Sequence, residues 1–189
     1  LMDAMTALHT RVSSPRLVEP APTPEHREAI FKAALRAPDH AALRSWRFLC
    51  VEGEGRVELG EKMVAAALRQ DPTLSEAMQT RRLNSPQRAP LVIVAVVRLR
   101  EHPKVPAIEQ WLSVGAATNN MLLAAHALGY GAMWRSGSLS YDRSFMTDIG
   151  LQAEEHIVGF LYMGSVAGAL KSPAEHVVSD YFSPWPAAT

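Results

Sequence analysis

The sequence is poor in cysteine, has no net charge and contains no long apolar run, and each shortage excludes a class of protein. A single cysteine, Cys50, rules out an internal disulfide and fits the reducing cytosol. Because 19 basic residues balance 19 acidic ones, no overall field attracts nucleic acid or an anionic membrane. The longest apolar runs, such as PLVIVAVV at 90–97, are too short to span a bilayer. We therefore expect a cytoplasmic protein without nucleic-acid or membrane partners, in which any anion site is local.

Several familiar catalytic signatures are also missing. No G-x-G-x-x-G follows a predicted strand and no G-x-x-x-x-G-K-S/T occurs, so neither usual nucleotide-phosphate loop is supported. H-E-x-x-H is absent and the seven histidines lack ligand spacing, so we expect no metal site. G-x-S-x-G, the hydrolase nucleophile elbow, does not occur. Cys50 lies in the apolar stretch FLCVE, which predicts an inert, buried thiol.

The hydrophobic pattern predicts one domain, residues 1–189, with more helices than strands. We predict helices at 2–9, 24–36, 56–70, 72–83 and 107–128. Thr23 is the expected N-cap of the second helix, and Gly129 is a suitable residue to end the longest one. We predict strands at 46–53, 90–99, 130–137 and 154–164. The strands are too few for a doubly wound sheet covered by these helices, so we predict an α+β layered domain.

Three segments carry candidate chemistry, and each has an ordinary structural alternative. Arg11-Val12-Ser13 with Arg16 could cradle a phosphate monoester, or it could be a solvated helix end, which this segment alone favours. In RAPDHAALRSWRF at 36–48, basic residues at a helix C-terminus suit the helix dipole. In GYGAMWRSG at 129–137, glycines allow a flat ring to approach the backbone, but an ordinary glycine-bounded strand is equally consistent.

Taken together and in order, these segments resemble the FMN-dependent nitroreductase family, and in particular its small, minimal NAD(P)H nitroreductase subgroup. The resemblance rests on the Arg-x-Ser opening, EPAPT, RAPDH…W.F, VEGEGR, RAPL, KVP..EQ, WRSG and IVGFLYMG, which are weak singly and strong when collinear. It implies an α+β sandwich with a mostly antiparallel central sheet flanked by helices. It also implies an intertwined homodimer with two FMN molecules at the subunit interface. The tail at about 168–189, with its three aromatic residues, is expected to pack on the partner.

The resemblance also assigns the cofactor-binding residues. It gives the FMN phosphate and ribityl contacts to Arg11, Val12 (through its backbone) and Ser13. It places Arg36 and His40 against the flavin of the other subunit, and it lines the cofactor with Trp134, Arg135 and Ser136. Lys171 is the expected basic residue that completes phosphate binding. The related subgroup assigns the nicotinamide cofactor to the segment formed by Ala124, Ala125, His126, Ala127, Leu128 and Gly129.

The implied activity is hydride transfer from NAD(P)H through flavin N5 to a nitroaromatic or quinone, in a ping-pong cycle. Positive charge from Arg135, or from Arg36 of the partner subunit, would stabilise the reduced flavin, and no side chain needs to act as a nucleophile. Three positions depart from the broad family, which usually has arginine at Val12 and amide side chains at Ala42 and Arg44. Loss of those amides leaves an alternative open, namely a flavin-binding sensor dimer without catalysis.

Overall fold

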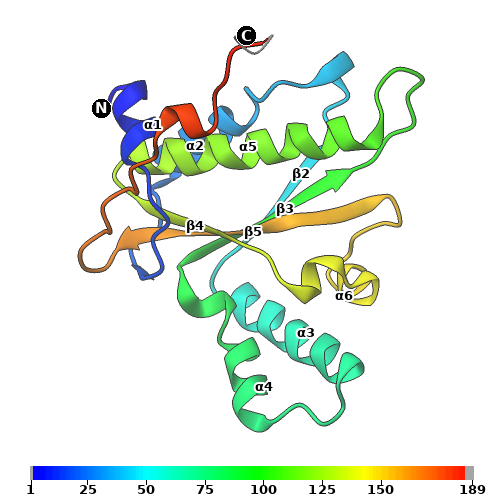
Figure 1. The fold of residues 1–189 in the computed structure, drawn as a ribbon. Helices are drawn as coiled ribbons and strands as arrows, with labels where there is room; N and C mark the ends of the chain where they lie inside the picture. Colours follow the sequence, from blue (N-terminus) through cyan, green and yellow to red (C-terminus); the bar gives the residue numbers. More distant parts are fainter. Residues whose placement is uncertain (1, 186–189) are drawn as a thin grey trace.

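A computed structural model of the chain, described here for residues 2–185, shows one antiparallel sheet covered by helices on both faces (Figure 1). The strand order is β1-β5-β3-β2, and β4 pairs with β5 beside β1. The strands are β1 (Leu17–Val18), β2 (Trp46–Val51), β3 (Leu91–Arg98), β4 (Gly131–Arg135) and β5 (Glu155–Val166). The predicted α+β sandwich around an antiparallel sheet is confirmed.

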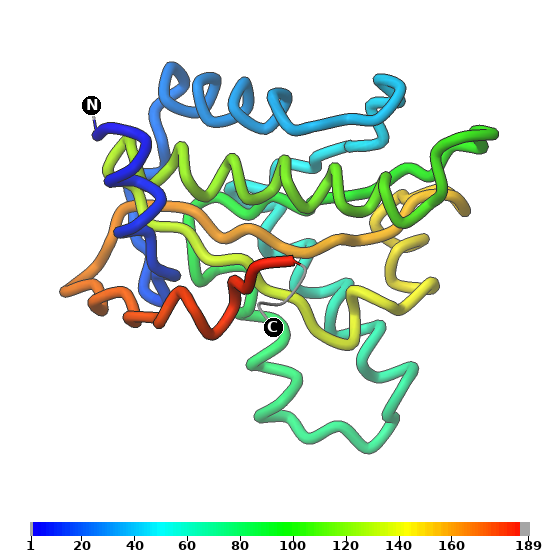
Figure 2. Tube along the Cα trace, turned by 45° about the horizontal axis from the view of Figure 1, so that its top comes forward, coloured from blue at the N-terminus to red at the C-terminus, as the bar shows by residue number. Residues whose placement is uncertain are grey.

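The helices form two layers. On one face lie α1 (Ala4–Thr10), α2 (Pro24–Ala34) and α5 (Ala107–Ala127); on the other lie α3 (Glu54–Gln70), α4 (Glu76–Leu83) and α6 (Arg143–Asp148). Figure 2 shows α2 running beside α5 along its length. Short 3-10 turns complete the connections: η1 (His40–Ala42), η2 (Pro86–Arg88), η3 (Ser138–Tyr141) and η4 (Val178–Asp180).

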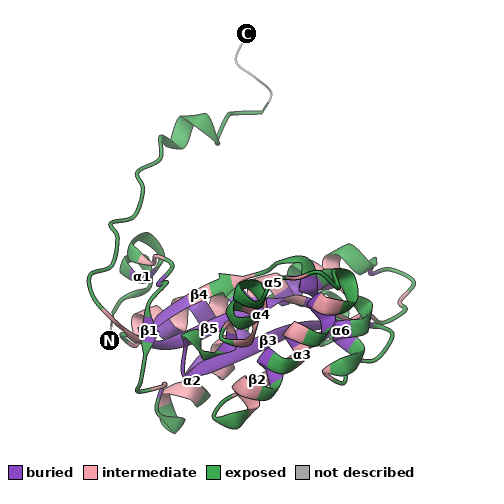
Figure 3. Cartoon of the chain, turned by 90° about the horizontal axis from the view of Figure 1, so that it is seen from below, coloured by how far each residue is buried: buried purple, intermediate pink, exposed green. Residues whose placement is uncertain are grey.

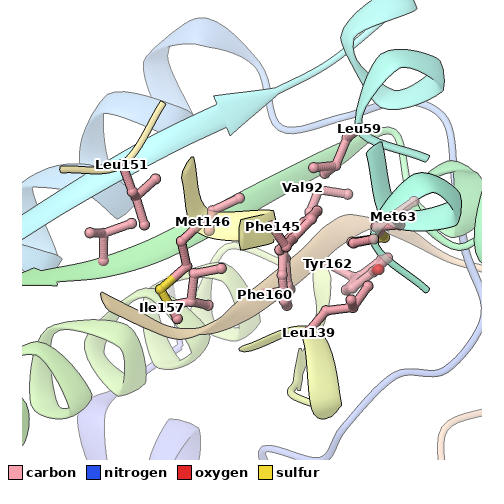
Figure 4. Packing of buried hydrophobic residues seen from close by; sticks show 14 of the residues in the cluster. Leu59, Met63, Val92, Leu139, Phe145, Met146, Leu151, Ile157, Phe160 and Tyr162 are labelled. Carbon is pink, nitrogen blue, oxygen red and sulfur yellow. The ribbon is translucent and has the colours of Figure 1, made fainter. Parts of the chain in front are cut away.

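Successive side chains of a strand point to opposite faces of the sheet, so the core is divided between these two faces. Every residue of β3 from Leu91 to Val97 is buried, as expected for a central strand that is apolar on both sides. Leu91 and Ile93 face α2 and α5, whereas Val92 and Val94 face α3 and α6. Figure 4 shows the cluster on the α3 and α6 side, in which other buried side chains surround the ring of Phe145.

The predicted start of α2 and the predicted end of α5 are confirmed, whereas α4 begins at Glu76, four residues after its predicted start. Thr23 Oγ1 accepts a hydrogen bond from His26 N at 3.2 Å, and Pro24 occupies the first helical position. Gly129 follows α5 with φ of 86°, a conformation that glycine adopts without strain. Within residues 2–185, the structure has no helix that combines the length and apolar character needed to cross a membrane.

Three features differ from the sequence predictions. The sheet has a fifth strand, the two-residue β1, which is too short to produce a hydrophobic period. Helix α6 is likewise short and was not predicted. Cys50 is exposed, so the prediction of a buried thiol is wrong. The reason is topological, because β2 forms the outer edge of the sheet and has a paired neighbour, β3, on one side only.

The C-terminal tail lies apart from the body of the domain. Figure 3 shows residues from Gly168 onward leaving the sheet as an exposed, extended segment. Tyr181, Phe182 and Trp185 are 71%, 75% and 94% exposed, which is unusual for large aromatic side chains in a single soluble chain. The last four residues of the predicted tail, 186–189, lie outside the described part.

Candidate functional site

Strand β4 forms the frame of the site. Among the described strands it pairs only with β5, and its other edge carries a single backbone hydrogen bond, from Ser14 N to Ala132 O. Its side chains alternate between the two faces of the sheet. Trp134 lies toward α5, where its ring edge is 3.9 Å from the position that a Cβ on Gly115 would occupy. It also lies against Gly159, where a Cβ would be 2.0 Å from Trp134 Nε1. Gly159 therefore makes room for this indole, and at Gly115 a Cβ would only reach ordinary contact distance.

A cavity of about 310 Å³ lies at the Gly131 end of β4. Ser13, Arg16 and Lys171 all line it, although Ser13 and Lys171 are far apart in the sequence. The N-terminal segment is held there because Ser14 N donates to Ala132 O at 3.0 Å. The cavity thus combines a hydroxyl group with two cationic side chains, a donor set that suits a phosphate. The structure brings two of the predicted phosphate contacts, Ser13 and Lys171, to one place.

Arg11 is not among the residues that line this cavity; it lies two residues before Ser13, near His126 at the C-terminal end of α5. Thr10 Oγ1 is 2.9 Å from His126 Nε2, which anchors the end of α1 to α5. Burial lowers the pKa of His126, and the nearby positive charge of Arg11 lowers it further. An uncharged His126 leaves the guanidinium of Arg11 as the cation at this end of the helix. Val12 is half-buried between Arg11 and Ser13.

A second cavity, of about 420 Å³, lies at the opposite end of β4. The predicted residues Arg135 and Ser136 line it, together with residues that the sequence analysis did not select: Arg81, Arg82, Ser85 and Arg88. Its apolar floor is built from Met63, Leu139, Phe160 and Tyr162, which lie at one end of the cluster in Figure 4. The cavity is therefore an apolar floor surrounded by guanidinium groups.

Arg135 is held in place by the ring of Tyr162. Its guanidinium carbon lies 5.5 Å from the ring centroid, within the range of a cation–π contact. Tyr162 is itself anchored, since its hydroxyl group is 3.2 Å from Ser85 Oγ. Burial lowers the pKa of Arg135, and the positive charge of Arg88 lowers it further. Arginine remains a cation at neutral pH nonetheless. The site therefore presents a fixed, partly desolvated positive charge.

Of the other predicted residues, His40 lies near the opposite end of α5, and Arg36 directly follows the C-terminal end of α2. His40 Nδ1 is 2.6 Å from Glu109 Oε2, in the first turn of that helix. The loop around His40 is strained, because Ala41, Ala42 and Arg44 all have φ between 51° and 59°. Such backbone outliers cluster at functional sites.

Side-chain and backbone contacts hold this strained loop. Asp39 Oδ2 accepts from Arg44 N at 2.8 Å, and Ser45 Oγ donates to Gln110 Oε1 at 2.8 Å. Gln110 is buried, and its side-chain amide also accepts a hydrogen bond from Arg100 N and donates one to Arg100 O. The start of β2 is thereby fixed to the start of α5, and His40 is presented at a defined position.

Within one chain the predicted residues form two separate groups. From Glu109 to His126, α5 rises by about 26 Å, so His40 and Arg11 lie near opposite ends of this helix. Arg11, Ser13, Lys171, Trp134, Arg135 and Ser136 follow β4, whereas Arg36 and His40 do not join them. This separation is what the resemblance predicts if the second group serves the flavin of the other subunit.

The segment predicted for the nicotinamide, Ala124–Gly129, is the last turn of α5. Ala125 is fully buried, and Leu128 N and Gly129 N bond the carbonyls of that turn. A helix C-terminus carries partial negative charge and does not favour phosphate groups. The assignment of this segment to the nicotinamide cofactor stays a prediction. On electrostatic grounds, the segment would contact an uncharged part of that cofactor and not its phosphate groups.

Comparison with known proteins relates this geometry to a family. Residues 11–165 match the nitroreductase family. The chain is 41% identical over 167 residues to "Putative NAD(P)H nitroreductase YdjA" of Escherichia coli K12, which covers 87% of this chain and 88% of that protein. It is 36% identical over 180 residues to a similarly named Haemophilus influenzae protein, covering 95% and 96% of the two chains. The chain belongs to the nitroreductase family.

Solved structures show the same nitroreductase fold. A nitroreductase-like protein from Bacillus cereus superposes with a TM-score of 0.82 at 22% identity, covering 98% of this chain and 97% of that one. A Desulfovibrio desulfuricans structure in complex with FMN has a TM-score of 0.75 at 21% identity, covering 98% and 100%. The predicted family and fold are confirmed by these matches.

Arg81, Arg82 and Arg88 of this nitroreductase were not among the predicted site residues. They come from α4 and η2, which precede β3, and they meet Arg135 only because β3 and β4 both flank β5. A signal was present in the run RRLNSPQR at 81–88, which has three arginines in eight residues. Within residues 2–185 no group of three or more potential metal ligands occurs.

Proposed function

We propose that this chain is an FMN-dependent oxidoreductase that transfers hydride from NAD(P)H to an electron-poor acceptor. Family membership and the names of the relatives support this activity, and structures of the same fold hold FMN. When bound, FMN supplies the redox chemistry, accepting a hydride from NAD(P)H and passing two electrons to a nitroaromatic or quinone in a ping-pong cycle. The protein binds the cofactor and controls what reaches it.

The observation that carries the proposal is the placement of two cavities at the two ends of β4. The Gly131–Arg135 strand spans about 13 Å between its end residues. A phosphate at one end and a flavin ring at the other fit such a separation, because a five-carbon ribityl chain connects them. The donors fit as well, with hydroxyl and cationic groups at the first cavity and the Arg135 guanidinium beside Ser136 at the second.

Ser13, Arg11 and Lys171 would hold the phosphate. The serine hydroxyl donates one hydrogen bond, while the two cations neutralise the dianion. Val12 lacks the guanidinium that the family resemblance predicts at its position, and we assign the compensating charge to Arg16, which lines the cavity with Ser13 and Lys171. Val12 would contribute only its backbone. The phosphate site would thus keep its full complement of cations in spite of the departure.

Trp134, Arg135 and Ser136 would border the ring. Trp134 is 37% exposed and offers a flat surface on the α5 face of β4, whereas Ser136 lines the cavity beside Arg135. Arg135 places a cation where negative charge accumulates on the ring, and its low-dielectric surroundings strengthen this effect. No side chain is expected to act as a nucleophile or as an obligatory base.

We also propose that the chain works as a homodimer of single-domain subunits, with Arg36 and His40 of the partner subunit completing each site. The distance of His40 from Arg11 along α5 favours contribution in trans. The exposed face of α5 supports an interface there, since Ile108 and Leu112 are 62% and 65% exposed on successive turns. The aromatic tail would cover the neighbouring subunit, which would bury its side chains.

An absorbance spectrum of the purified protein, followed by anaerobic mixing with NADH and NADPH, tests this function. We expect a flavin spectrum that bleaches with at least one nicotinamide and recovers on addition of a nitroaromatic or quinone. We expect Arg11→Ala to retain less FMN than the wild type at equal protein concentration. Unchanged flavin content in that variant would contradict the phosphate assignment.

The loop that carries Ala42 and Arg44 gives the competing function its one specific support. Neither side chain can supply the amide contacts that the broad family makes near the flavin edge. If the purified protein holds FMN but neither nicotinamide bleaches it, the chain is a flavin-binding sensor. Protein that stays colourless after incubation with FMN would exclude both the flavin oxidoreductase and the flavin-binding sensor.

A further inference from the structure

The cavity at the Arg135 end of β4 contains more positive charge than a flavin ring requires. Four arginines line it, from α4, η2 and β4: Arg81, Arg82, Arg88 and Arg135. No acidic side chain is among its lining residues, and none of the four guanidiniums forms a salt bridge within residues 2–185. Elsewhere in the fold, Arg47 and Arg98 both pair with the buried Glu155. Among the described residues, the cavity thus gathers four arginines that no carboxylate pairs with.

Packing does not account for these arginines. Helix α4 has no buried residue, so Arg81 and Arg82 do not support a core through it. The Nε atom of Arg82 is buried without a hydrogen-bond partner, which costs free energy. Arg88 and Arg135 are close enough for the positive charge of Arg88 to lower the pKa of Arg135. A cluster that destabilises the free protein in these ways is expected where an anion binds.

The flavin itself balances only part of this charge. A reduced ring carries one negative charge, and Arg135 already faces the position assigned to it. The three remaining arginines surround a volume of about 420 Å³ whose rim also carries the Ser85 and Ser136 side chains. Guanidinium forks with neighbouring hydroxyl groups match the oxygens of a phosphate or a carboxylate. They match a neutral aromatic substrate poorly.

We propose that Arg81, Arg82 and Arg88 bind a phosphate or carboxylate group of a substrate that reacts at the flavin. This proposal rests on the proposed function, because it places the anionic group within reach of the ring beside Arg135. The same chemistry has two sources, the 2′-phosphate of NADPH and the carboxylate of an anionic acceptor. The cavity then sets which nicotinamide or which acceptor the enzyme prefers.

The test uses the FMN-loaded protein and the double variant Arg81→Gln/Arg88→Gln, which removes two positive charges and keeps polar side chains. Arg100→Gln is the matched control, because Arg100 is exposed and follows the opposite end of β3 from Arg88. Anaerobic flavin reduction is compared between NADPH and NADH. Reoxidation is compared between 4-nitrobenzoate and its neutral methyl ester. Direct binding is measured with adenosine 2′,5′-bisphosphate against AMP, and with benzoate against methyl benzoate, so one readout does not depend on turnover.

We expect the double variant to react at least tenfold more slowly with one of the anionic substrates, NADPH or 4-nitrobenzoate. Its affinity for the matching anionic ligand should fall at least tenfold as well. The neutral or less charged member should change less than twofold, and Arg100→Gln should resemble the wild type. A loss confined to NADPH and adenosine 2′,5′-bisphosphate identifies the nicotinamide as the source, and a loss confined to the carboxylates identifies the acceptor. If the double variant shows the same rates and affinities as the wild type for both members of every pair, the proposal is overturned. So does a loss of FMN from the variant, because the arginines would then belong to the flavin.

Failure of the proposed function has a different signature. Wild-type protein that holds no FMN, or whose flavin neither nicotinamide reduces, contradicts the enzyme assignment before any variant is compared. In that case the binding measurements still decide whether the arginine cavity selects anions.

Discussion

Glu155 gives the sharpest quantitative prediction, because its carboxylate is fully buried at the start of β5 between two arginines. Its oxygens accept from Arg47 Nη1 at 2.6 Å, from Arg98 Nη2 at 2.8 Å and from Gln152 N at 3.0 Å. Burial alone would raise the pKa of Glu155. The backbone hydrogen bond and the two arginines outweigh it and lower that pKa to about 2, from an ordinary value of 4.5.

The size of the effect follows from the two pKa values. At about 1.36 kcal/mol for each pH unit, the interval between 4.5 and about 2 corresponds to roughly 3 kcal/mol of folding free energy. Because the folded pKa is the lower one, this stability is fully present above pH 4.5 and is lost as the pH falls toward 2. At pH 3 about half of it should remain. Arg47 and Arg98 are 35% and 40% exposed, so both can rehydrate if the carboxylate is removed.

Urea unfolding followed by tryptophan fluorescence, at fixed chain concentration between pH 7 and pH 3, tests this expectation. Glu155→Gln should lower the free energy of unfolding by roughly 3 kcal/mol at pH 7 and by about half as much at pH 3. Glu28→Gln is the control, because the Glu28–Lys32 pair is on the surface, and little change is expected. If the wild type and Glu155→Gln differ by the same amount at every pH, the ion-pair reasoning is refuted.

Three further predictions concern the candidate site. Gly159→Ala should displace the Trp134 indole, cost about 1–3 kcal/mol of stability and weaken FMN binding; unchanged urea midpoint and unchanged FMN affinity would contradict this packing. Lys171→Gln should raise the Kd for FMN about tenfold at low salt and less at high salt, measured by flavin fluorescence quenching; an effect independent of salt would argue against a charge contact. Glu109→Gln should raise the Kd for FMN by up to about fivefold, because the side chain that orients His40 becomes neutral, while Glu109→Asp should lose less.

Most of the local structure could be predicted from the sequence. The buried strand β3 has an apolar run that needs no partner to be recognised, and the ends of α2 and α5 follow from Thr23, Pro24 and Gly129. The fold class followed from the ratio of helices to strands together with the family resemblance. Short elements such as β1 and α6 could not be predicted, because a period needs more residues than they have.

The assembly of the site depended on sheet topology. Ser13 and Lys171 share a cavity because β1 and the end of β5 meet, and Arg88 meets Arg135 because β3 and β4 lie on either side of β5. Strand order is a property of pairings between distant segments, which no local pattern encodes. The exposure of Cys50 has the same origin, since only the complete sheet shows that β2 is an edge strand.

The sequence by itself determined which segments become helices and strands, which family the chain resembles, and most of the residues assigned to FMN. Side-chain periodicity, helix capping and sequence motifs depend on residues close together in the chain, so they can be recognised without knowing the tertiary structure. The tertiary structure alone decided that four arginines from three elements surround one cavity, and that His40 lies far from Arg11. These are distances across the sheet and along a helix, and they are fixed only when the chain packs.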